Sequence, residues 1–132
     1  MDNHQKKRLE STENQHQSAL IKWTQVARQK YPELKLLYHV PNERKCTPAE
    51  GARLKRMGVK RGVPDLCLPV SRHGYSALYI EMKTDTGKTS KEQDWWLEEL
   101  RKAGNFCEVC HGWDSARRVI EWYLSSAGKN NG

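Results

Sequence analysis

Two segments with alternating apolar and polar residues, separated by a short loop, constrain the fold most. They are DLCLPV at residues 65–70 and ALYIEMK at residues 77–83, and SRHGYS lies between them. Alternation with a period of two is typical of a β-strand that buries one face. Because a short loop containing glycine favours a hairpin, we predict that the two strands are antiparallel neighbours in one sheet.

The polar face of this hairpin carries two carboxylates and one ammonium group. Asp65 opens the first strand, and Glu81 and Lys83 lie two residues apart on the second. Since side chains two residues apart point the same way and neighbouring strands lie about 4.8 Å apart, the three groups can converge. Two carboxylates suit Mg²⁺, and an ammonium group can orient water beside it. The pattern favours phosphodiester hydrolysis, although Glu-x-Lys alone is more typical of a solvated strand face.

The rest of the chain predicts an α/β fold in the order α-β-α-β-β-α-β-α, with helices flanking a mixed sheet. Its length of 132 residues suits one hydrophobic core, so we expect a single domain over residues 11–124 with a flexible arm at 1–10 and a flexible tail at 125–132. Caps predict helix starts at Thr12, Thr47 and Asp114, and Thr89 and Ser90 are two overlapping candidates for the cap of another helix. The other predicted elements are a strand at 34–40, a basic helix at 48–57, a helix that ends near Gly104, and a strand at 106–110.

Positive charge dominates the chain, with 23 Lys and Arg against 16 Asp and Glu and a net charge of +7. The eighteen-residue stretch 44–61, which leads into Asp65, contains seven basic residues, namely Arg44, Lys45, Arg53, Lys55, Arg56, Lys60 and Arg61. A solvated surface is the ordinary interpretation of such a run, but its place beside the acidic pair favours contact with DNA phosphates. The sequence contains no helix-turn-helix or zinc-finger signature, so we expect recognition of DNA shape rather than base sequence.

Four cysteines, at positions 46, 67, 107 and 110, are predicted to be free thiols in a reducing compartment. The N-terminus lacks the apolar stretch of a signal peptide and the chain lacks an apolar run of membrane-spanning length, so we expect a cytoplasmic protein without membrane association. Cys107-x-x-Cys110-His111 matches the attachment pattern of haem c, but it lies in a strand pattern, and we expect no haem. A structural zinc site would need two more ligands with convincing spacing.

Four separated motifs, in this order, resemble the virus-type replication and repair nuclease domain, VRR-NUC. They are Glu13-Asn14-Gln15, GVPDLCLPV, YIEMK and the helix that contains Gln93, and the resemblance covers about residues 11–124. This family lies in the PD-(D/E)xK superfamily, so the resemblance implies a restriction-endonuclease-like core. It also implies a Mg²⁺-dependent endonuclease, with Mn²⁺ as a substitute, that leaves 5′-phosphate ends on DNA.

The resemblance also implies roles for individual residues. Asp65, Glu81 and Glu13 match the metal-binding acids, and Lys83 matches the catalytic lysine that positions the attacking water. Gln93 and Asn42 match positions near the site, although a helix cap and a turn are competing interpretations of these two residues.

The small stand-alone members that this chain resembles, encoded by phages and bacteria, imply a homodimer that resolves four-way (Holliday) junctions. Two alternatives stay open at the level of sequence. One is a nickase or flap endonuclease without junction specificity, and the other is a basic DNA-binding module in which the acidic pair is structural.

Overall fold

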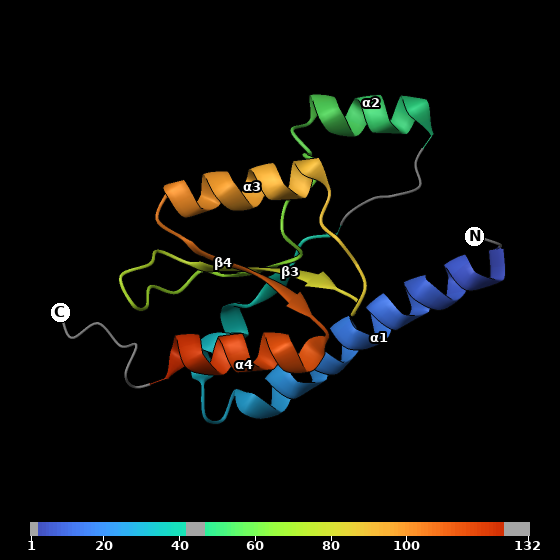
Figure 1. The fold of residues 1–132 in the computed structure, drawn as a ribbon. Coiled ribbons are helices and arrows are strands. Elements are labelled where there is room, and N and C mark those ends of the chain that lie inside the picture. The colour runs from blue at the N-terminus through green and yellow to red at the C-terminus, as the bar shows by residue number, and fades with distance from the viewer. Residues whose placement is uncertain (1–2, 42–46, 126–132) are drawn as a thin grey trace.

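The chain forms one four-stranded mixed sheet with helices on both faces (Figure 1). The computed structural model describes residues 3–41 and 47–125, and it describes side chains in the first helix from Asn14 onward. The predicted α/β class and the predicted order of helices and strands are confirmed. The elements are α1 (Asn3–Ala27), the 3₁₀ helix η1 (Pro32–Leu36), β1 (Tyr38–His39), α2 (Pro48–Arg56), β2 (Leu66–Leu68), β3 (Leu78–Lys83), α3 (Lys91–Lys102), β4 (Phe106–His111) and α4 (Trp113–Leu124).

The predicted hairpin forms the centre of the sheet. The strand order is β1-β2-β3-β4, and β2 pairs with β3 in the antiparallel sense, with Leu66 opposite Ile80 and Leu68 opposite Leu78. β4 lies parallel to β3, and α3 supplies the crossover that a parallel connection requires. The carboxyl ends of β1, β3 and β4 therefore lie at the same end of the sheet as the start of β2.

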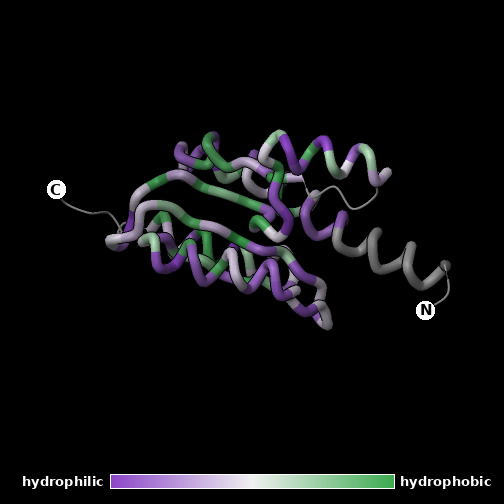
Figure 2. The backbone as a smooth tube through the Cα atoms, turned by 90° about the horizontal axis from the view of Figure 1, so that it is seen from above, coloured by the Kyte–Doolittle hydropathy of each residue, from purple (hydrophilic) through white to green (hydrophobic). Residues whose placement is uncertain are grey.

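The main hydrophobic core lies between one face of the sheet and the pair α1 and α4. Strand residues of that face, such as Leu66 and Ile80, pack against Leu20 of α1 and Ile120 of α4, and all four are 0% exposed. The hydrophobic strand segments lie between the helices in Figure 2. Full burial of each such side chain stabilises the fold by about 1.5–3 kcal/mol.

The other face of the sheet is also covered. α3 lies over it (Figure 1), and its Leu97 is 3% exposed, as is Cys107 of β4. Glu81 belongs to this face and is only 1% exposed. The interpretation of Glu-x-Lys as a solvated strand face is therefore wrong for Glu81, which is shielded from solvent.

Three local predictions are wrong. α1 begins at Asn3, so residues 3–10 are helical and Thr12 lies inside the helix rather than at its cap. Lys, Arg, Gln, Glu and Leu in this stretch are good helix formers, and no proline or glycine interrupts them. The predicted strand at 34–40 is mostly η1, because Pro32 favours a helical first turn and only Tyr38 and His39 pair with β2.

The third wrong prediction is the cap of α4. Its N-cap is Gly112, whose φ of +90° allows β4 to turn directly into the helix, so Asp114 lies in the first turn instead. There Arg117 Nη2 lies 2.7 Å from Asp114 Oδ1 and lowers the pKa of Asp114. The pair therefore stabilises the first turn of α4 rather than capping it.

The predicted cap of α2 forms, and of the two candidate caps of α3 it is Ser90 that forms. Thr47 Oγ1 accepts a hydrogen bond of 3.1 Å from the Glu50 amide, with Pro48 at the first helical position. Within residues 48–56, which the structure describes in full, no α2 side chain is buried. None of the helices in the described part of the chain combines the length and hydropathy of a membrane-crossing segment.

Candidate active site

The acidic pair lies at the end of the sheet where β3 finishes and β2 begins. The register that sets Leu66 opposite Ile80 sets Asp65 opposite Glu81. The Met82 amide donates a hydrogen bond of 2.9 Å to Asp65 Oδ2. This bond ties the Asp65 carboxylate to β3 one residue before β2 begins, and it holds the carboxylate beside the strand that carries Glu81.

Lys83 completes the group predicted from the hairpin. It lies two residues after Glu81 and therefore on the same face of β3, and it is partly exposed where Glu81 is buried. Two carboxylates on facing strands repel one another, and a positive charge near them stabilises their charged forms.

Helix α1 crosses this end of the sheet through two contacts that sequence patterns do not reveal. The side-chain amide of Gln17 contacts His39 Nδ1, which lies 3.0 Å from the backbone oxygen of Asp65. The neighbouring His16 accepts a hydrogen bond of 3.2 Å from the Trp113 amide at the start of α4. Residues 16 and 17 thus connect α1 to both sides of the site.

The predicted third acid, Glu13, lies one helical turn before Gln17. Residues four apart on a helix share a face, so the backbone of α1 places Glu13 on the face that meets His39. The side chain of Glu13 lies outside the described residues. Its role as a ligand therefore stays a prediction.

The donor set fits a hard divalent cation. Among the residues whose side chains the structure describes, no three His, Cys, Asp or Glu side chains gather into a metal-binding group. Asp65 and Glu81 nevertheless bring two carboxylates together, and Mg²⁺ is typically held by one or two carboxylates together with water and substrate phosphate. These two residues match that requirement without a third protein ligand.

Gln93 takes part in the helix cap. Its Oε1 accepts a 2.9 Å hydrogen bond from the Ser90 amide, and its own amide donates one of 3.2 Å to Ser90 Oγ. This reciprocal pair is the capping box of α3, so the capping interpretation is confirmed. A role for Gln93 in the site stays a prediction.

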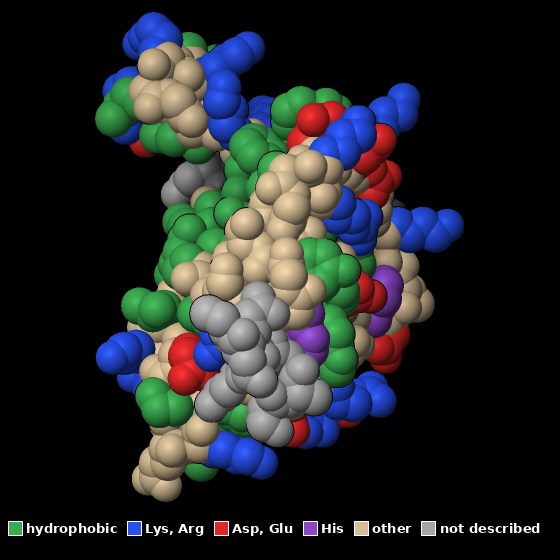
Figure 3. All heavy atoms as spheres, turned by 90° about the vertical axis from the view of Figure 1, so that its left-hand side faces the viewer, with side chains coloured by type: hydrophobic (Ala, Val, Ile, Leu, Met, Phe, Trp, Pro, Cys, Tyr) green, Lys and Arg blue, Asp and Glu red, His purple; other side chains and the backbone are tan. Residues whose placement is uncertain are grey.

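The basic residues divide between α2 and the loop that precedes Asp65. Arg53, Lys55 and Arg56 lie on α2, which stands apart from the sheet in Figure 1, and Figure 3 shows Lys and Arg side chains projecting from the top of the molecule. Lys60 and Arg61 lie in the loop and are exposed. The other residues predicted to bind DNA, Asn42, Arg44 and Lys45, lie outside the described residues.

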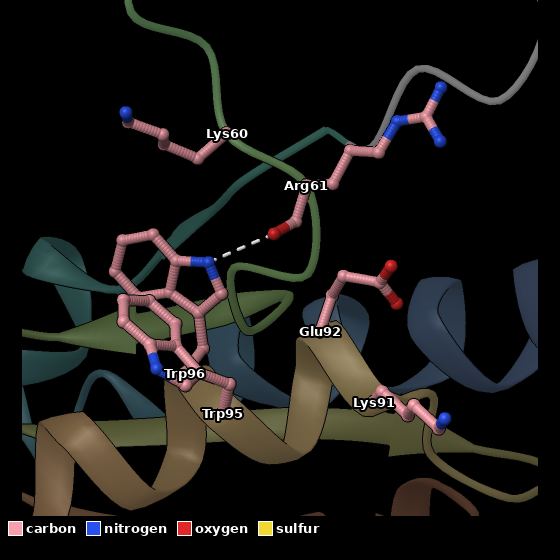
Figure 4. A pocket seen from close by; sticks show the side chains of 6 residues that line it. All are labelled: Lys60, Arg61, Lys91, Glu92, Trp95 and Trp96. Atoms are coloured by element: carbon pink, nitrogen blue, oxygen red, sulfur yellow. Dashed lines mark hydrogen bonds between the residues drawn. The ribbon is translucent and has the colours of Figure 1, made fainter.

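Sequence reasoning missed how this loop is fixed to α3. Trp96 Nε1 donates a hydrogen bond of 2.9 Å to the backbone oxygen of Arg61 (Figure 4). The next residue, Gly62, has a φ of +86°, and a Cβ there would lie 2.7 Å from the backbone carbon of Glu92. The loop backbone thus rests on the first turn of α3, three residues before Asp65.

The buried cysteines of β4 lead to a prediction about reactivity. Burial raises the pKa of Cys107 to about 11 and that of Cys110 to about 12. Because a raised pKa lowers the thiolate fraction at a given pH, both residues are thiols at pH 8. In a Cys46→Ser variant we expect iodoacetamide to alkylate both at least about a hundredfold more slowly in the native protein than in guanidinium.

Mass spectrometry of the Cys107 and Cys110 peptides measures these rates separately. Strand alternation sets the two thiols on opposite faces of β4, and Cys110 belongs to the main core. Equal alkylation rates in native and denatured protein would contradict the burial of these two side chains.

Comparisons with known proteins give one consistent result. The model of the VRR-NUC domain family matches residues 11–114. A solved structure described as a VRR_NUC domain protein is 33% identical to this chain, with a TM-score of 0.74 over 86% of this chain and 88% of that chain. A search of curated proteins finds no match.

Proposed function

This chain belongs to the VRR-NUC family, which implies a nuclease of the PD-(D/E)xK type that acts on DNA with a divalent metal, and from this premise we propose a Mg²⁺-dependent endonuclease that cleaves four-way DNA junctions as a homodimer. One observation carries the proposal most. Asp65 is tied by its carboxylate to β3 directly opposite Glu81, with Lys83 on the same face. The geometry therefore supports the hydrolytic pattern that the sequence predicted.

Each member of this group has a distinct task. Asp65 and Glu81, with Glu13 as the proposed third ligand, would hold the cation. A divalent cation bound there would stabilise the negative charge that develops on the scissile phosphate. The Lys83 ammonium group orients the attacking water and adds positive charge beside the phosphate. The burial of Glu81 keeps bulk water away from one side of the reacting group.

The surface around the site suits a branched polyanion. α2 and the loop before Asp65 supply five cations that can contact backbone phosphates, which fix position without reading sequence. A four-way junction has approximate two-fold symmetry, so a two-fold dimer sets one site against each of two equivalent strands. This match of symmetry is the reason for proposing a junction and a homodimer together.

The direct test uses end-labelled four-way junction and linear duplex of matching sequence, incubated with Mg²⁺ or with EDTA. We expect paired, symmetric cuts in the junction with Mg²⁺, 5′-phosphate ends, and less than a tenth of that cleavage in the duplex. Light scattering of the same sample should give the mass of a dimer.

Other outcomes select between the alternatives. Equal cleavage of duplex, or a single cut in a flapped substrate, would make the enzyme a nickase or flap endonuclease without junction specificity. Binding without products in either Mg²⁺ or Mn²⁺ would favour a non-catalytic DNA-binding module.

A further inference from the structure

A solvent-open depression lies between the loop before Asp65 and the first turns of α3. Its volume is about 520 Å³, and Figure 4 shows the side chains that line it. The lining residues are Lys60, Arg61, Lys91, Glu92, Trp95 and Trp96. None of these side chains has a part in the hydrolytic group described above, so the depression needs an explanation of its own.

Its two indole rings are arranged differently. Trp96 is held in place by the hydrogen bond from its Nε1 to the Arg61 backbone oxygen. Trp95 packs edge-on against it, with ring centroids 5.5 Å apart and planes at 86°, and is 56% exposed. An exposed indole of this kind offers a face on which another flat ring can stack.

The charges around the rings favour an anion. Lys60, Arg61 and Lys91 supply three positive charges against the single negative charge of Glu92. Lys60 and Arg61 extend in opposite directions from the loop, Lys60 on the side of the indoles and the Arg61 side chain away from them (Figure 4). A flat aromatic group attached to phosphates complements this combination of ring surface and cations.

We propose that this depression binds an unpaired nucleotide of the DNA substrate, with its base stacked on Trp95 and its phosphates held by Lys60 and Lys91. The inference rests on the proposed function, because it takes DNA as the ligand. In a duplex each base face is covered by its neighbours, whereas an unpaired base can stack on an aromatic side chain. The depression would therefore take up a base that has left its pair at the branch point of the junction.

The position of the depression relates it to the hydrolytic group. Gly62 rests on the backbone of Glu92 and lies three residues before Asp65. Even in an extended chain, the Cα atoms of these two residues are at most about 11 Å apart. A base stacked on Trp95 would thus lie within a few nucleotides of the phosphate held at Asp65. Binding there would select where along a strand the cut falls.

A contact between two copies of this chain is the main competing use of an exposed tryptophan. Two such surfaces placed face to face would bring together a net charge of +2 from each copy, and like charges juxtaposed across an interface cost several kcal/mol. The charge around the depression therefore favours a nucleic acid over a second copy.

The test compares fluorescein-labelled oligo-dT of twelve nucleotides with a blunt duplex of twelve base pairs, by fluorescence anisotropy in EDTA. We expect Trp95→Ala to bind oligo-dT roughly 5- to 100-fold more weakly and duplex within about twofold of wild type. Trp95→Phe should restore most of the affinity, because a phenyl ring also stacks. Trp122→Phe is the matched control, since Trp122 is 44% exposed but lies on α4, stacked on His73.

Several results would overturn the proposal. Unchanged oligo-dT affinity in Trp95→Ala would do so, as would an equal loss of duplex affinity or dissociation of a dimer caused by this variant. Cleavage assays in Mg²⁺ separate the two proposals. If the wild type cleaves DNA normally and Trp95→Ala shows no selective loss of oligo-dT affinity, the nucleotide site alone is rejected. If Trp95→Ala loses oligo-dT affinity selectively but the wild type cleaves no DNA, the nuclease proposal alone is rejected.

Discussion

Replacing Lys83 with alanine is expected to lower Mg²⁺-dependent cleavage by about 10²–10⁴-fold while DNA affinity stays within about threefold. The variant removes the ammonium group that shares a face with Glu81, but it leaves the strand intact, since the Lys83 backbone oxygen still accepts the 2.9 Å hydrogen bond from the Gly112 amide. Single-turnover cleavage of a labelled junction, with enzyme in excess, measures the chemical step separately from binding.

Asp65→Asn provides a matched comparison for this result. An asparagine oxygen still accepts the Met82 hydrogen bond, so the fold at the start of β2 is kept while the negative charge is lost. We expect this variant to lose both cleavage and Mn²⁺ binding, measured by calorimetry, whereas Lys83→Ala loses cleavage alone. Near-normal nicking by Lys83→Ala would exclude a catalytic role for the lysine.

Gly62→Ala is expected to cost about 2–5 kcal/mol of unfolding free energy. Two effects add up at this position. An alanine at a φ of +86° is strained by about 1–2 kcal/mol, and its Cβ would lie 2.7 Å from the backbone of Glu92, a clash with an overpacking cost of about 1–3 kcal/mol. Urea denaturation measures the change, and cleavage should fall with it because the same loop carries Asp65.

Gly58→Ala separates the two effects. Gly58 has a similar φ of +94°, but no atom lies within 4 Å of the position a Cβ would take. This variant should therefore lose only about 1–2 kcal/mol. Equal losses in the two variants would show that the contact between the loop and α3 adds nothing to stability.

The acidic pair and Lys83 could be predicted because their positions depend on local rules. Strand alternation fixes which side chains share a face, and a hairpin brings its own two strands into register. Asp65 and Glu81 are only sixteen positions apart, so one short loop decides whether they meet. In the structure Glu81 and Lys83 share one face of β3, and the register sets Asp65 opposite Glu81.

The supporting contacts could not be predicted in the same way. Trp96 meets Arg61 across 35 positions, and His16 meets Trp113 across 97, so each contact depends on how whole elements pack. No periodicity in either segment identifies its partner. The segment at 34–40 was ambiguous for a different reason, because its closely spaced leucines suit a helical turn as well as a strand.

The separation of α2 from the core affects how relatives of this protein can diverge. Since no side chain of residues 48–56 is buried, substitutions there change folding free energy by only about 0.5 kcal/mol in either direction. The charges of this helix can therefore change while the fold around Asp65, Glu81 and Lys83 stays in place. Under the proposed function, contact with the substrate and cleavage of the bond would thus be open to selection separately.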